Sequence, residues 1–107
     1  ERMEACEEKV DFFNKAGGCA IWGAAGKGTT LVNTIDPQNR RVRFLIDINP
    51  AKHGKYVPGT GHEIVSPSYL REQRSRIAGI VNMNPNYLEE NRSILSQMSL
   101  DIPIISL

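Results

Sequence analysis

The chain lacks the features that would place it in a membrane or on a nucleic acid. None of its apolar runs approaches the roughly 20 residues that a membrane-spanning helix needs. Its 13 basic and 12 acidic residues leave a net charge of +1, which excludes bulk attraction to nucleic acid or to a membrane surface. Residues 1–4 open a charged helix pattern, not a signal peptide. We therefore expect neither a nucleic-acid nor a membrane partner.

Cysteine is scarce as well. We interpret Cys6 and Cys19 as small buried side chains of a protein in a reducing, cytoplasmic compartment. Together with His53 and His62 they do not form the short-spaced pattern of a zinc site, so we expect no metal. Neither histidine has an acid close in the sequence to complete a catalytic triad. We interpret both as hydrogen-bonding surface or loop residues.

What remains is the composition of one ordinary globular domain. The 107 residues are 40% hydrophobic and 23% charged, which is enough for a single modest core. Because the chain does not begin with methionine, we expect it to be a domain of a longer protein. Apolar residues at helical spacing, followed by Gly17-Gly18, predict a leading or linker helix within residues 1–18. Residues 19–107 are then the domain proper.

Strands and helices alternate along those residues. Predicted strands cover residues 19–22, 41–47, 63–65, 77–82 and 103–107. Predicted helices run from about Lys27 to Ile35, from Ser66-Pro67 to about Arg74, and from a cap at Asn84-Pro85 to about Met98. This alternation predicts an α/β fold, a Rossmann-like three-layer αβα arrangement with a mainly parallel sheet of four to five strands.

The turn after the first predicted strand is the most informative segment. Three glycines there let backbone N–H groups approach an anion, and the helix start adds a partial positive charge. A nucleotide-hydrolysing P-loop is excluded, because Gly28 stands where Ser or Thr is required and Ile21 where the first glycine is required. The dinucleotide fingerprint is also incomplete, since Ala25 stands at its second glycine. The predicted ligand contacts are Gly23, Ala24, Gly26, Lys27 and Gly28. The alternative is that these glycines merely let the helix pack close to the sheet.

A long loop over residues 48–62 supplies a second set of candidates. It leaves the carboxyl end of the second predicted strand, beside the glycine turn, where ligands bind in open α/β sheets. Asp47 stands where a ribose-binding acid is expected. Lys52 and Lys55 are suited to a diphosphate, and Tyr56 to stacking on a base or a sugar. The alternative is a solvated loop with its lysines in water.

Two spaced blocks resemble a known family. Residues 21–31, Ile-Trp-Gly-Ala-Ala-Gly-Lys-Gly-Thr-Thr-Leu, resemble the opening of the C-terminal domain of sugar C-methyltransferases that use S-adenosylmethionine. The second block follows at the family's distance and reads Asp47-x-Asn49-Pro50-x-Lys52-x-Gly54-Lys55-Tyr56-x-Pro58-Gly59-Thr60. Residues 63–67 and Leu70 also fit, whereas residues 74–76 and 83–86 depart from the family's pattern. The resemblance implies a Rossmann-like domain that helps close a substrate cleft around a nucleotide-linked sugar.

On this basis we predict an accessory, nucleotide-sugar-binding domain of a methyltransferase, with no catalytic residue of its own. The resemblance implies that a central domain of the same parent chain is its partner, binds S-adenosylmethionine and carries the catalytic base. The expected ligand is a nucleotide-linked sugar or a similar phosphorylated small molecule. Two alternatives stay open: a free-standing dinucleotide-binding, oxidoreductase-type domain with Asp47 on the ribose, and a scaffold whose glycine turn is empty. The sequence leaves the sugar, the nucleotide, the methylated position and the oligomeric state undetermined.

Overall fold

The computed structural model describes residues 2–106, with the backbone alone at Arg2. In this part of the chain, five strands form one parallel sheet in the order β3-β2-β1-β4-β5. The strands are β1 (Cys19–Trp22), β2 (Leu45–Ile46), β3 (Ile64–Val65), β4 (Gly79–Asn82) and β5 (Ile104–Ser106). This order is that of a Rossmann fold, so the predicted fold class is confirmed.

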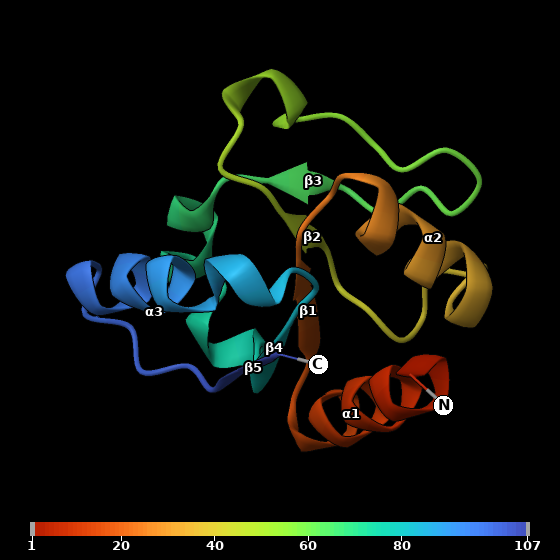
Figure 1. Ribbon diagram of the computed structural model, residues 1–107, viewed down its shortest axis with the longest axis horizontal. Helices are drawn as coiled ribbons and strands as arrows, with labels where there is room; N and C mark the ends of the chain where they lie inside the picture. The colour runs from red at the N-terminus through yellow and green to blue at the C-terminus, as the bar shows by residue number, and fades with distance from the viewer. Residues whose placement is uncertain (1, 107) are drawn as a thin grey trace.

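Helices cover both faces of the sheet (Figure 1). On one face, α1 (Arg2–Ala16) and α2 (Gly26–Ile35) contribute Val10, Phe13 and Leu31 to a core that includes Ile21 of β1. On the other face, α3 (Leu88–Gln97) and a 3-10 turn over Pro67–Arg71 pack on alternate strand residues, among them Trp22. Because successive strand residues face opposite sides and both sides are covered, every residue of β1 is buried. The division of the chain at residue 18 stays a prediction, although α1 shares the core of the domain.

Two predicted elements are shorter than the sequence pattern indicated. The strand predicted over 41–47 is reduced to Leu45–Ile46, because the N–H groups of Arg41 and Val42 donate to the carboxylate of Asp36 at 3.0 and 2.9 Å instead of to a strand. The helix predicted from residue 66 is only a 3-10 turn over Pro67–Arg71, followed by a second one over Arg74–Arg76. Residues 71–76 offer no apolar side chain to bury, so nothing extends the first turn into an α-helix.

Other predicted boundaries lie within a few residues of the observed ones. β1 is found at residues 19–22 as predicted, α2 begins one residue earlier than predicted, and β4 begins at Gly79. The side chain of Asn84 accepts a hydrogen bond from the N–H of Asn86 at 3.0 Å, and a 3-10 turn over Pro85–Tyr87 leads into α3. Residues 1 and 107, at the ends of predicted elements, lie outside the described residues. Within the described part, no helix has the length and apolarity needed to cross a bilayer.

A buried polar cluster fastens the long loop to the end of α2. His62 is fully buried, and its Nε2 donates to Oδ2 of Asp36 at 2.8 Å, while its Nδ1 lies 2.6 Å from Oγ1 of Thr60. Burial by itself raises the pKa of Asp36, but hydrogen bonds from three backbone N–H groups and from His62 outweigh it and hold the pKa below its ordinary value. His62 is therefore a hydrogen-bonding loop residue as predicted, but a buried one. It is closed off from any substrate.

Candidate functional site

Two adjoining cavities open at the carboxyl end of the sheet, over the start of α2. Their volumes are about 480 and 430 Å³, and both are lined by Gly26, Lys27, Asn82 and Met83. β1 leads to α2 and then to β2 on one side, whereas its neighbour β4 leads to α3 and then to β5 on the other. This reversal of direction between neighbouring strands is the place where open α/β sheets bind ligands.

The turn between β1 and α2 is pinned to the end of β2. Gly23 has a φ of +125°, and its N–H donates to the carbonyl of Ile46 at 2.8 Å. The next N–H, that of Ala24, donates to Oδ2 of Asp47 at 3.3 Å. Gly28 is buried against the carbonyl oxygen of Gly23, so that a Cβ atom at Gly28 has no room. Gly23 and Gly28 are thus required by chain geometry and by close packing of the helix.

Gly26 has no such structural reason. A Cβ atom at this position would meet nothing within 4 Å, and Gly26 lines both cavities. The residue before it, Ala25, caps α2 without a side-chain hydrogen bond, and the first turn of the helix holds no acid. N–H groups in the first turn of a helix have no acceptor within the helix, and the helix dipole adds positive character there. With Lys27 also lining both cavities, this end of α2 is suited to an anionic group.

Asp47 lies at the edge of the larger cavity, where the sequence predicted a ligand-binding acid. Its two carboxylate oxygens already accept one backbone hydrogen bond each, from Ala24 at 3.3 Å and from Asn49 at 2.8 Å. The carboxylate therefore joins the glycine turn to the beginning of the long loop. Free acceptor capacity remains on both oxygens for a ligand hydroxyl group.

The far wall of the larger cavity comes from residues that the sequence analysis did not single out. Asn82 ends β4, and its Oδ1 accepts from Nδ2 of the buried Asn91 at 2.8 Å, while its Nδ2 donates to the carbonyl of Asn84 at 2.7 Å. Tyr87 and Glu90 stand at the rim, and Tyr87 is about half exposed. A signal was present: Asn82 is a polar residue that ends an otherwise apolar strand.

The loop candidates lie at the same end of the sheet but outside these cavities. Figure 1 shows the loop over 48–62 and the β1–α2 turn at one end of the sheet. Of residues 47–62, Asp47 and Ile48 line the larger cavity, whereas Lys52, Lys55 and Tyr56 line neither cavity. The loop is anchored by the cap of Asn49 on a 3-10 turn over residues 50–52 and by a bond from Asn33 of α2 to the carbonyl of residue 58. Ligand contact by the two lysines and Tyr56 stays a prediction.

The site carries groups that can bind both an anion and hydroxyl groups. Within residues 2–106, no three side chains of His, Cys, Asp or Glu gather as a metal site would require. The site offers helix N–H groups and one ammonium for an anion, with carboxylate and amide oxygens for hydroxyl groups. Trp22 and Tyr87 supply apolar surface beside them.

A family model described as the C-methyltransferase C-terminal domain matches residues 6–99. The fold is similar to that of UDP-D-quinovosamine 4-dehydrogenase from Vibrio fischeri, with a TM-score of 0.65 and 22% identity over 85% of this chain and 77% of that one. It is also similar to a Rex-family repressor, with a TM-score of 0.57 and 14% identity over 85% of this chain and 52% of that one. No curated protein matches the sequence significantly.

Proposed function

The chain belongs to the family of C-methyltransferase C-terminal domains, and we propose that it is the accessory, substrate-binding part of a methyltransferase that uses S-adenosylmethionine. In this proposal the domain holds a nucleotide-linked sugar, or a similar phosphorylated small molecule, while a methyltransferase domain of the same parent chain supplies the methyl donor and the catalytic base. The domain by itself transfers no methyl group, because the reaction needs a donor and a base aligned with the acceptor carbon. The buried thiol of Cys19 suits a reducing, cytoplasmic compartment.

The observation that carries the proposal is the open start of α2. Of the three glycines in the turn, Gly23 is required by the backbone geometry and Gly28 by close packing of the helix. Gly26 has open space around its Cα atom and lines both cavities. The diphosphate of a nucleotide sugar would lie against the first N–H groups of α2 and the ammonium of Lys27. Asp47 and the asparagines after β4 would then take the hydroxyl groups. Lys52, Lys55 and Tyr56, on the loop at the same end, would contact the part of the ligand that extends beyond the cavity.

The dinucleotide-binding alternative has one observation in its favour. The fold is shared with a dehydrogenase, although at 22% identity this likeness concerns the fold alone. Against this alternative, the methyl group of Ala25 occupies the position at which the fingerprint requires glycine for approach of the pyrophosphate. Both oxygens of Asp47 also hold backbone N–H groups, so ribose binding would have to share them.

The test is a titration of the isotope-labelled chain with a nucleoside diphosphate sugar, followed by amide shifts. We expect the largest shifts at residues 23–28 and 82–84. Lys27→Gln should weaken binding by about tenfold, the scale of one hydrogen bond to a charged group. Lys15→Gln is the matched control, because Lys15 is an exposed lysine on α1 that lines neither cavity.

Three outcomes would count against the proposal. Shifts confined to residues away from 23–28 and 82–84 would contradict the assignment of the site. Equal losses of ligand affinity in Lys27→Gln and Lys15→Gln would mean that Lys27 contributes only through the net charge of the chain. Tighter binding of a nicotinamide dinucleotide than of the nucleotide sugar, at the same residues, would favour the oxidoreductase-type alternative.

A further inference from the structure

A third cavity, of about 310 Å³, opens at the amino-terminal edge of the sheet. Its lining residues precede the strands: Asn14 comes before β1, Arg43 and Phe44 before β2, and Arg76 before β4. Apart from Met3 and Cys6 of α1, the cavities over α2 are lined by residues at or after the carboxyl ends of strands. Because all five strands run parallel, the two regions lie at opposite ends of the strands.

Positive charge dominates this cavity. Its lining holds Arg40, Arg41, Arg43 and Arg76 but a single carboxylate, that of Glu63. Arg41 is neutralised from α1, since its guanidinium lies 2.9 Å from a carboxylate oxygen of Glu7 and 2.6 Å from one of Asp11. Within residues 2–106, the ion pairs include none of the other three arginines. The cavity therefore carries an excess of positive charge that the described residues do not compensate.

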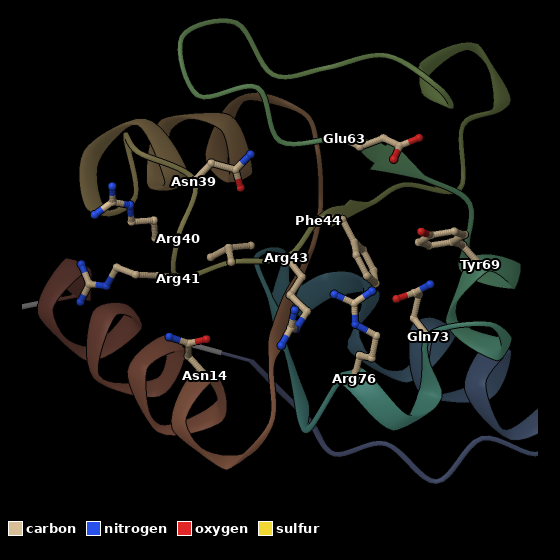
Figure 2. Close-up of a pocket in the computed structure, with 11 residues that line it drawn as sticks. Asn14, Asn39, Arg40, Arg41, Arg43, Phe44, Glu63, Tyr69, Gln73 and Arg76 are labelled. Carbon is tan, nitrogen blue, oxygen red and sulfur yellow. The ribbon is translucent and has the colours of Figure 1, made fainter.

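The side chain of Arg43 and the backbone of Arg76 come together over Gly18. In the view of Figure 2 the guanidinium groups of Arg43 and Arg76 lie beside one another, whereas the side chains of Arg40 and Arg41 point away from them. Nη2 of Arg43 donates to the carbonyl of Gly17 at 3.2 Å, which leaves the other donors of this exposed side chain available. Gly18, with a φ of +146°, permits this approach, because a Cβ atom there would collide with the Arg43 side chain and with the carbonyl of Arg76.

The wall beside the two guanidinium groups is aromatic and neutral. The rings of Phe44 and Tyr69 pack edge to face, with centroids 5.3 Å apart and planes at 78°. Gln73 and Asn14 place amide groups on the same cavity. Figure 2 shows Glu63 at the far side of Phe44 from the arginine pair, so its carboxylate does not stand between them. The arrangement offers two guanidinium groups, two side-chain amides and an aromatic ring surface to one ligand.

We propose that Arg43 and Arg76 form a site for the phosphate group of a small phosphorylated molecule, separate from the site over α2. Two guanidinium groups that converge repel each other until an anion lies between them, and their planar forks match the oxygens of a phosphate. Gln73 and Tyr69 then hydrogen-bond the rest of the ligand, and the Phe44–Tyr69 wall contacts a sugar or a base. A phosphosugar and a nucleoside monophosphate share this chemistry and fit a cavity of this size.

The experiment titrates the 107-residue chain with inorganic phosphate, ribose 5-phosphate and adenosine 5′-monophosphate, each followed by amide shifts. We expect shifts at Gly17, Phe44 and Arg76 with all three probes, and the tightest probe identifies the ligand class. Arg76→Gln should weaken binding by about tenfold. Arg74→Gln is the matched control, because it removes the same charge from the same 3-10 turn but does not line the cavity.

The Arg76→Gln variant is expected to fold, since within residues 2–106 the side chain of Arg76 makes no hydrogen bond or ion pair. The dispersion of the amide resonances in its NMR spectrum checks that it is folded. Arg43→Lys, which keeps the charge and loses the fork, should also weaken binding. The proposal is overturned if millimolar phosphate moves no resonance near Gly17 and Arg76. It is equally overturned if Arg76→Gln and Arg74→Gln lose the same affinity, which would indicate general attraction of anions to a basic surface. Shifts confined to residues 23–28 would assign the phosphate to the site over α2 instead.

Discussion

The carbonyl oxygen of Gly23 occupies the space that a side chain on Gly28 would need. A Cβ atom at Gly28 would collide with this oxygen, while its distance of 3.4 Å to a methyl group of Leu45 in β2 would be an ordinary contact. Gly28→Ala must therefore push the start of α2 away from the sheet. We expect a loss of about 1–3 kcal/mol in the free energy of unfolding, the scale of an overpacked core, measured by urea denaturation.

Gly26→Ala is the matched comparison within the same turn. Its added methyl group meets nothing within 4 Å, and alanine suits a helix better than glycine, so we expect unchanged or slightly higher stability. Ligand affinity should fall in this variant, because the methyl group intrudes where an anion approaches the backbone. Equal destabilisation by the two substitutions would show that the turn is uniformly tight and would remove the argument for Gly26 as a ligand-facing residue.

The loop lysines can be separated from Lys27 by mutation. Lys27 lines both cavities over α2, whereas Lys52 and Lys55 lie on the loop outside them. We expect Lys52→Ala with Lys55→Ala to weaken binding of a nucleoside diphosphate sugar by about 1–3 kcal/mol, measured by calorimetry. Lys9→Ala with Lys15→Ala removes two exposed charges from α1 and is the control. Unchanged affinity in the loop variant would remove the loop from the site and leave the cavity assignment intact.

Asp36 should make the fold sensitive to acid. Its pKa lies below the ordinary value in the folded chain, so its contribution to stability is complete above the unfolded pKa of about 3.9 and is lost as the pH falls through the folded pKa. Asp36→Asn should lower the free energy of unfolding by about 2–4 kcal/mol at pH 7. The reason is that an NH₂ group, itself a donor, replaces one carboxylate oxygen that accepts hydrogen bonds from buried donors. The difference between wild type and variant should shrink below about pH 4.

Urea midpoints between pH 3 and 7 measure this difference. Asp101→Asn, at an exposed carboxyl group, should show no comparable loss. A wild-type advantage over Asp36→Asn that stays constant down to pH 3 would contradict the assignment of Asp36 as an acid-sensitive anchor of the loop.

Cys19 should be inert as long as the chain is folded. Burial, with a smaller contribution from the charge of Asp11, raises the pKa of its thiol to about 12, and the residue is fully buried in β1. Alkylation followed by peptide mass spectrometry should find Cys19 unmodified in the native chain and modified in urea. Rapid modification of Cys19 in the native chain would mean that β1 opens readily.

Several features were readable in the sequence because they depend on local patterns. Alternation of apolar strands with helical periodicity predicted the parallel sheet, and Asn84-Pro85 predicted the start of the helical segment that leads into α3. The glycine turn predicted a helix start, and α2 begins there with no side-chain cap, whereas the anion contact expected at this turn stays a prediction. The family resemblance carried by residues 21–31 and 47–60 is confirmed by the match over residues 6–99.

Contacts between distant segments were not readable. The hydrogen bond between His62 and Asp36 joins residues 26 positions apart. Asp36 also accepts hydrogen bonds from the N–H groups of Arg41 and Val42, which shortens the predicted second strand. Arg43 and Arg76 precede β2 and β4, the two strands that flank β1, and they approach one another because Gly18, before β1, has no side chain to separate them. Local residue preferences determined the elements and the class of fold. Strand order, which depends on which hydrophobic faces are buried together, decided which side chains share a cavity.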